Sequence, residues 1–160
     1  MSIALTALLF GLSLSAHSFE FDQAKAYAGG GAAMNNNGDE SAFGFQGFGG
    51  YDFKDDIEIA DTVSMAAEVG YTYSGEWDFG FGGKFKIKGP WVAAVFSIDF
   101  SDEIDIVNRI GWSFADKNAD GLITGLGLDY HMDEQLTIRG EIVMQGYKGF
   151  QLGALYRFGS

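Results

Sequence analysis

The sequence LITGLGLDYHMDEQLTIRGEIVMQGYKGFQLGALYRF, residues 122–158, alternates apolar and polar side chains through three consecutive segments. Its even-numbered positions are mostly large and apolar, whereas its odd-numbered positions are rich in glycine, glutamine and charged residues. Because neighbouring side chains of a β-strand point to opposite faces, this period of two predicts three consecutive strands joined by short polar turns. The last segment ends on Tyr156-Arg157-Phe158.

Similar segments precede this stretch, and polar clusters divide residues 19–160 into eight expected strands. They cover approximately residues 25–34, 42–53, 64–74, 79–100 (with an uncertain start between 79 and 84), 104–114, 122–132, 136–145 and 150–158. With both termini at one end of the sheet, the short connections at 35–41, 75–83, 116–121 and 146–149 belong to the other end, and the longest, 54–63, lies beside the termini.

Two positions interrupt the alternation. Phe48 falls on the otherwise polar phase of the second strand. In the fourth strand, the apolar residues change from odd positions to even positions around Gly89-Pro90. One extra residue in a strand produces such a change, and a lone proline is tolerated at such a site, so we expect a β-bulge near Pro90.

The composition of the two faces indicates what surrounds the sheet. The polar phase is sparse and glycine-rich, while the apolar phase is bulky and nearly unbroken. A small closed barrel has little interior volume, so the bulky phase fits the outside, against lipid. An open edge in hydrocarbon leaves backbone groups unpaired at several kcal/mol each. We therefore predict an all-β fold, an eight-stranded antiparallel transmembrane up-and-down β-barrel. Aromatic girdles are expected at Tyr51, Phe53, Phe100, Trp112, Phe114, Tyr130 and Phe158.

Charged side chains also occupy the inward phase. We expect an interior charge network made of Glu68, Arg109, Asp129, Arg139, Glu141 and Arg157, with His131 on the same phase. Buried charges persist only when they are paired, and the lumen of an eight-stranded barrel is narrow enough for side chains to fill. The network therefore predicts a filled lumen, and an ion pathway is the alternative.

The N-terminal residues form a separate segment. Residues 3–14 are almost entirely apolar, and Ala16-His17-Ser18 provides small residues at the spacing that signal peptidase accepts. We therefore predict that residues 1–18 are a cleaved signal peptide and that residues 19–160 form the barrel domain. Cleavage after Ala16, or retention of the segment as a buried helix or membrane anchor, remains open.

Composition excludes several classes of protein. The chain has no cysteine, which excludes disulfides and thiolate metal sites and agrees with export. Its net charge of −12 argues against nucleic-acid binding, because neutralising phosphates requires clustered lysine and arginine.

The last three strands also resemble a known family. The residues Gly127-Leu128-Asp129-Tyr130, the acidic turn Asp133-Glu134, and the strand residues 136–141 and 152–158 are similar to the C-terminal strands of OmpA-like and opacity-type barrels. The resemblance implies a bacterial outer-membrane location, contact with membrane lipids and lipopolysaccharide, and recognition of the C-terminal strand ending at Phe158 by the barrel assembly machinery. Here Gly159-Ser160 follow that aromatic residue.

Three functions agree with these expectations. A structural role in envelope integrity is preferred, because the expected external connections are short and long external loops usually carry binding activity. A narrow ion or small-solute channel and a surface adhesion or ligand-binding protein are the alternatives. Catalysis is not expected, since His131 has no nearby serine motif, and no cofactor is expected. The oligomeric state is left open.

One loop has the start of a calcium-binding pattern. Asp116, Asn118 and Asp120 alternate along the chain, and Gly121 occupies the sixth position. Position twelve is Gly127, where an EF-hand requires a bidentate glutamate. The pattern therefore indicates a polar hairpin loop, with weak surface binding of Ca²⁺ as the alternative.

Overall fold

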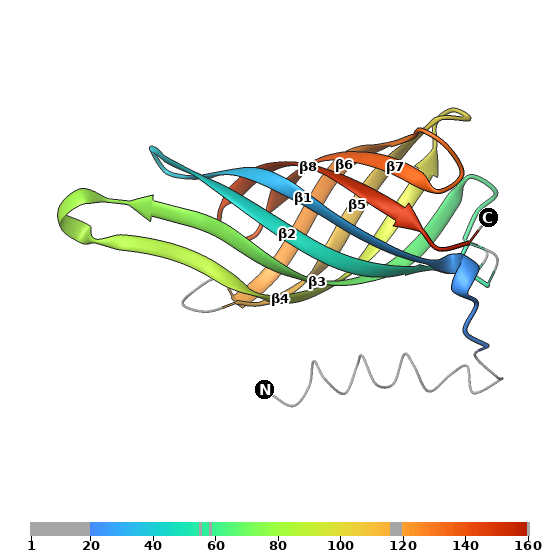
Figure 1. Ribbon diagram of the computed structural model, residues 1–160, viewed down its shortest axis with the longest axis horizontal. Coiled ribbons are helices and arrows are strands. Elements are labelled where there is room, and N and C mark those ends of the chain that lie inside the picture. Colours follow the sequence, from blue (N-terminus) through green and yellow to red (C-terminus); the bar gives the residue numbers. More distant parts are fainter. Residues whose placement is uncertain (1–19, 55, 58, 116–119, 160) are drawn as a thin grey trace.

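The computed structural model describes residues 20–54, 56–57, 59–115 and 120–159, which form one closed antiparallel sheet (Figure 1). The strands of this part of the chain are β1 (Ala26–Asn37), β2 (Glu40–Asp52), β3 (Val63–Asp78), β4 (Lys84–Asp99), β5 (Ile104–Phe114), β6 (Asp120–His131), β7 (Leu136–Met144) and β8 (Lys148–Arg157). Short 3-10 helices, η1 (Gln23–Lys25) and η2 (Gly80–Gly82), precede β1 and follow β3. Each strand pairs with its chain neighbours, and β1 pairs with β8. The predicted eight-stranded barrel is confirmed.

No helix in the described ranges is long and apolar enough to cross a membrane. Residues 1–18, predicted to be a signal peptide, lie outside the described residues.

The barrel has two distinct ends. We call the end where β1 begins and β8 finishes the terminal end, and the opposite one the distal end. Figure 1 shows that the β3–β4 hairpin projects well beyond the β1–β2 and β7–β8 turns. The predicted strands were shorter here, because residues 75–78 were expected to form a turn. In the structure β3 continues to Asp78, and β4 begins at Lys84.

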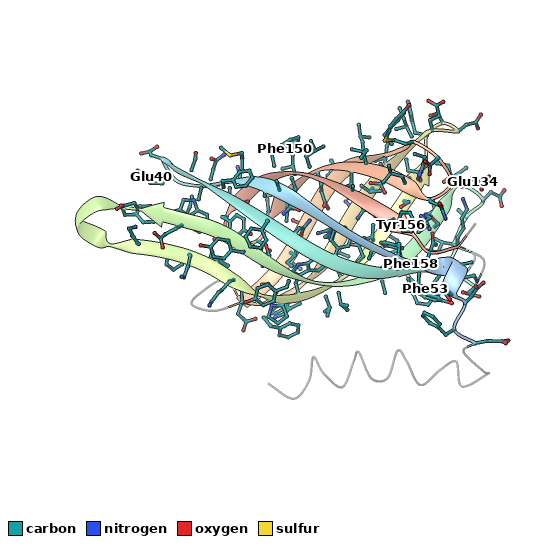
Figure 2. All side chains as sticks on the ribbon, viewed as in Figure 1. Glu40, Phe53, Glu134, Phe150, Tyr156 and Phe158 are labelled. Carbon is teal, nitrogen blue, oxygen red and sulfur yellow. The ribbon has the colours of Figure 1, made fainter. Side chains whose placement is uncertain are left out.

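The outward face of the barrel is apolar. Most of the even-numbered side chains of β5 to β8 that the sequence placed outside are about half exposed, and they include Ile110, Leu126, Leu128, Ile142, Phe150 and Leu152. Figure 2 labels Phe150 and Tyr156 on β8, with Phe158 beyond its end. An apolar surface of this extent on a soluble protein would cause aggregation, whereas it suits contact with lipid chains.

Aromatic side chains gather near both ends of this surface. Phe100, Tyr130 and Phe158 are exposed at the terminal end, where the rings of Tyr51 and Phe53 lie 5.1 Å apart. Trp112 and Phe114, each about half exposed, lie near the distal end of β5. These are the positions that the sequence assigned to the two girdles.

The bulge predicted near Pro90 is wrong. The register shift lies in β3 between Tyr73 and Glu76, where Gly75 has a φ of 83°. β4 itself keeps one phase throughout, with Ile87 buried and Trp91 also buried. The apolar residues move from odd to even positions because the polarity of the two faces inverts along β4. The side chains at odd positions point inward throughout the strand. Towards the distal end the outward face becomes polar and the inward face apolar.

The loop predicted at residues 35–41 is also wrong. β1 continues to Asn37 and β2 starts at Glu40, so that only Gly38 and Asp39 connect them. Gly38 has a φ of 68°, a conformation that glycine adopts without steric cost in tight hairpin turns.

β1 and β8 meet along a glycine-rich seam. Gly31 lies opposite Gly153, and a Cβ atom on Gly31 would lie only 2.6 Å from the carbonyl oxygen of Leu152. A Cβ atom on Gly153 would likewise lie 2.7 Å from the carbonyl oxygen of Gly30. The two backbones therefore approach so closely at this seam that side chains do not fit between them.

Candidate functional site

Five charged side chains meet inside the barrel, and we call them the central ion cluster. They are Glu68 on β3, Arg109 on β5, Asp129 on β6, and Arg139 and Glu141 on β7. Each lies on the inward phase of its strand, and each side chain is at most 7% exposed. The sequence had grouped these five residues by phase alone, and the structure places them in contact.

Arg139 is the most completely paired member of the central ion cluster. It lies directly opposite Asp129 in the β6–β7 ladder, and its Nε and Nη2 donate to the two carboxylate oxygens of Asp129 at 2.7 and 2.8 Å. Its Nη1 donates to Glu68 Oε1 at 2.7 Å. Such a bidentate pair fixes the plane of the guanidinium group, so Arg139 joins three strands rigidly.

Arg109 is held differently. Its Nη2 lies 3.1 Å from Glu68 Oε2 and 3.1 Å from Glu141 Oε2. Its guanidinium group also stacks on two aromatic rings, at 4.7 Å from the centre of Trp91 and 5.7 Å from that of Phe48. The Nε and Nη2 atoms of Arg109 are buried without a hydrogen bond. A desolvated cation on the face of an indole is stabilised by about 2 kcal/mol, so the two rings compensate for these missing bonds.

Three aromatic residues of this site were not identified from the sequence. They are Tyr27, Phe48 and Trp91, all buried in the lumen. The hydroxyl of Tyr27 donates to Glu68 Oε1 at 2.8 Å. Only Phe48 gave a signal, since it interrupts the alternation of β2. Tyr27 lies in a strand whose glycine and alanine residues obscure the phase, and Trp91 follows the proline that was taken to mark a bulge.

Arg157 lies outside the central ion cluster. Its Nη1 donates to Asp52 Oδ2 at 3.1 Å, and the side chains of this pair are 32% and 16% exposed. The guanidinium group lies 5.5 Å from the centre of the Tyr27 ring. The pair faces a cavity of about 210 Å³ at the terminal end, which Arg139 and Asp129 of the cluster also line. Arg157 therefore belongs to the mouth of the lumen.

His131 lines the same cavity. Its Nε2 lies 2.8 Å from Asp105 Oδ2, and its Nδ1 lies 2.9 Å from Thr137 Oγ1. An imidazole between a carboxylate and a hydroxyl resembles a nucleophile triad in outline. However, Thr137 is 3% exposed and does not line the cavity, so its hydroxyl is closed to a substrate there. The arrangement orients the imidazole at the mouth.

The calcium candidate is only partly described. Asp116 and Asn118 lie outside the described residues. The Oδ1 atom of Asp120 accepts a hydrogen bond from the indole of Trp112 at 2.9 Å. Over the described ranges, no three His, Asp or Glu side chains gather in a way that would hold a metal ion.

A separate apolar cluster fills the lumen at the distal end, and we call it the distal plug. It consists of the buried residues Ala42, Trp77, Ile87, Ala115 and Tyr147, with Phe85 packed against them. The Trp77 ring lies 5.4 Å from that of Tyr147, and its Nε1 donates to the backbone carbonyl of Asn35 at 3.2 Å. The sequence did not predict this plug, because Trp77 was assigned to a turn.

Amide side chains occupy the lumen between these two clusters. Gln46 on β2 donates to Gln151 on β8 over the intervening β1, and Gln145 donates to Ser113. All four side chains are buried. From the terminal end to the distal end, the lumen therefore contains a polar cavity, the central ion cluster, a layer of amides and the distal plug.

Comparison with protein families gives a match to the model described as the OmpA-like transmembrane domain, over residues 10–143. No curated protein sequence matches the chain.

Several solved structures share the fold. A de novo designed transmembrane β-barrel matches 86% of this chain and 98% of its own, with 12% identity and a TM-score of 0.58. Ail, the attachment invasion locus protein of Yersinia pestis, matches 82% of this chain and 96% of its own, with 16% identity and a TM-score of 0.53. Ail in complex with the heparin analogue sucrose octasulfate matches 82% of this chain and 95% of its own, with 13% identity and a TM-score of 0.51.

Proposed function

The chain belongs to the OmpA-like transmembrane domain family and is an outer-membrane β-barrel protein, and from this premise we propose that it serves envelope integrity as a closed, non-conducting barrel. The observation that supports this proposal is the central ion cluster, which links β3, β5, β6 and β7 across the lumen. The ion pairs of this cluster hold the opposite walls together, and their side chains occupy the space through which an ion would pass. The proposed role requires neither catalysis nor a cofactor.

The proposal includes an orientation. Both ends of the described chain lie at the terminal end, which we assign to the periplasm, and the distal end then faces outward. Export would depend on residues 1–18 as a cleaved signal peptide. Insertion would depend on β8 and Phe158, whose exposed ring is 5.9 Å from that of Tyr156, as the strand that the barrel assembly machinery reads.

Conductance tests the closed lumen. Purified protein reconstituted into planar bilayers is expected to give no steady open pores, because the ion cluster, the amide layer and the distal plug close successive levels of the lumen. Recovery of the folded, heat-modifiable form from the same membranes is the control for insertion. Steady pores from folded protein would contradict the proposal and favour the narrow-channel alternative.

The outer surface of β4 suggests where the protein meets lipopolysaccharide. Along its outward phase, Val92, Ala94 and Phe96 are followed towards the distal end by Pro90 and then by Lys88, Lys86 and Lys84. The inward phase of the same segment belongs to the distal plug, so the core holds the lysines outward. At about 3.4 Å per residue, the three lysines extend some 20 Å beyond Pro90, across the headgroup region. We assign this row to the phosphate groups of lipopolysaccharide.

The three lysines are not equivalent. Lys84 Nζ lies 2.8 Å from Glu76 Oε1, and the hydrogen bond to Glu76 raises the pKa of Lys84. Lys86 lies directly opposite Glu76 in the ladder. Lys88 lies opposite Tyr73, so its cross-strand neighbour carries no negative charge. Lys88 is therefore the residue with the most charge to offer to a phosphate, and Lys86 follows, because Lys84 makes the ion pair with Glu76.

The double variant Lys86→Gln, Lys88→Gln tests this assignment. Lipopolysaccharide is expected to stabilise the wild-type barrel more than the variant, by about 1 kcal/mol per lysine removed. The measurement is urea-induced unfolding in membranes with and without lipopolysaccharide. Lys54→Gln, which removes an exposed lysine at the terminal end, serves as the control. Equal stabilisation of the double variant and the wild type would refute the assignment.

Surface binding is the second candidate function, and the projecting β3–β4 hairpin favours it. The hairpin is longer than the sequence predicted, and its lysine row is accessible from outside the barrel. A soluble polyanion is the ligand that such a row would take. Binding of sucrose octasulfate by the wild-type protein, lost in the Lys86, Lys88 variant and kept in Lys54→Gln, would support this candidate.

A further inference from the structure

The central ion cluster does not balance its charges. It contains three carboxyl groups and two guanidinium groups, so full ionisation would leave one net negative charge inside the barrel. Glu68, Arg109 and Glu141 are at most 2% exposed, so water compensates little of this charge. An uncompensated buried carboxylate costs several kcal/mol, and the usual response is that the group takes up a proton.

The hydrogen bonds identify which carboxyl group is uncompensated. Asp129 accepts two hydrogen bonds from Arg139. Glu68 accepts one from Arg139 and one from the hydroxyl of Tyr27. Glu141 has only the Nη2 of Arg109 at 3.1 Å, which it shares with Glu68, and its Oε2 atom is buried without a hydrogen bond.

The other neighbours of Glu141 add no positive charge. In the two ladders, Gly127 on β6 and Gln151 on β8 lie opposite it. Gln46 on β2 and Phe48 line the small space beside it. The ionisable groups with the largest influence on Glu141 are Arg109 and Arg139, which are positive, and Glu68 and Asp129, which are negative. Arg139 is already engaged by the two acids.

We propose that Glu141 is a proton-binding site and that this side chain is a neutral carboxylic acid in the folded barrel. The inference rests on the filled lumen of the proposed function. In the unfolded chain the same group is in water and ionised at neutral pH, because the ordinary pKa of glutamate is about 4.3. Folding therefore takes up one proton from solvent at Glu141. With that proton bound, the two remaining carboxylates balance the two arginines.

Proton uptake makes folding pH-dependent in a defined direction. Stability falls with rising pH wherever the folded state binds more protons than the unfolded state. For one proton, the folding equilibrium constant of the wild type falls about tenfold per pH unit relative to a variant that lacks the site. Glu141→Gln is such a variant, since its amide is a neutral substitute of similar shape.

The experiment measures folding in detergent micelles by gel mobility at a series of urea concentrations, between about pH 6 and pH 8. Glu141→Gln is expected to fold. The ratio of its folding equilibrium constant to that of the wild type is expected to rise about tenfold per pH unit. Glu134→Gln, in the exposed β6–β7 turn, is the matched control and is expected to stay parallel to the wild type. Parallel curves for Glu141→Gln and the wild type would overturn the proposal.

Infrared spectroscopy of the folded wild type provides a second readout that does not depend on any variant folding. A buried protonated carboxylic acid gives a carbonyl band separate from those of carboxylates, and this band is expected at about pH 8, where carboxyl groups in water are ionised. Absence of the band would overturn the proposal. Conductance tests the closed lumen separately. A negative result for the proton on Glu141 therefore does not refute the closed lumen, and steady pores do not by themselves refute the bound proton.

Discussion

Replacing Arg139 with methionine is expected to destabilise the folded barrel by about 3–5 kcal/mol. Methionine is close in length to the aliphatic part of arginine, so the loss comes from charge rather than from volume. It removes both hydrogen bonds to Asp129 and the one to Glu68, and leaves two buried carboxylates without their main partner. Breaking one side of a buried ion pair in this way is more costly than replacing the whole pair.

Arg157→Met is the matched control for this variant. Arg157 also makes an ion pair inside the barrel wall, but that pair is partly exposed to solvent. Its removal is expected to cost about 1 kcal/mol or less. Urea-induced unfolding in lipid vesicles compares both variants with the wild type. If Arg139→Met and Arg157→Met lowered the free energy of unfolding equally, burial in the central ion cluster would not determine how much stability is lost.

Trp77→Ala is expected to cost about 3–5 kcal/mol, because it opens a cavity in the distal plug. The indole is fully buried, it packs against Phe85 and Tyr147, and its Nε1 bonds to the backbone of Asn35. Loss of the indole also removes the ring contact that joins the β3–β4 hairpin to Tyr147. Limited proteolysis of folded protein in vesicles is therefore expected to cut this hairpin faster in the variant.

Trp77→Phe separates the contribution of packing from that of the hydrogen bond to Asn35. Phenylalanine keeps most of the apolar volume and loses the hydrogen bond to Asn35, so a loss of about 1–2 kcal/mol is expected. Unfolding in vesicles gives the stability, and the rate of cleavage gives the local effect. If Trp77→Ala unfolded like the wild type, the distal plug would not contribute to the stability of the barrel.

The sequence predicted the barrel well where one face meets lipid along the whole strand. From β5 to β8 the outward positions are mostly large and apolar, whereas the inward positions are mostly small, polar or charged, with a few aliphatic residues such as Val107 and Ile123, so the period of two is clear. The prediction failed at β3 and β4, because both strands extend beyond the apolar surface. There the outward row becomes lysine and the inward row becomes Trp77, Phe85 and Ile87, so hydrophobicity no longer marks one face.

The charged site was predicted in part for a similar reason. Phase alone placed Glu68, Arg109, Asp129, Arg139 and Glu141 inside. Which of them touch depends on height along the barrel axis and on the stagger between strands, and the periodicity of one strand contains neither quantity. Arg157 shares their phase but lies near the mouth with Asp52. The aromatic partners of Arg109 come from β2 and β4, two strands whose pattern was interrupted.

The glycine seam between β1 and β8 has a consequence for how the barrel forms. The two strands that close the sheet are the first and the last of the barrel, and every other pair consists of chain neighbours. Closing so long a loop is entropically slow. Folding is therefore expected to proceed through an open sheet of neighbouring hairpins, with the joining of β1 to β8 as the final and rate-limiting event.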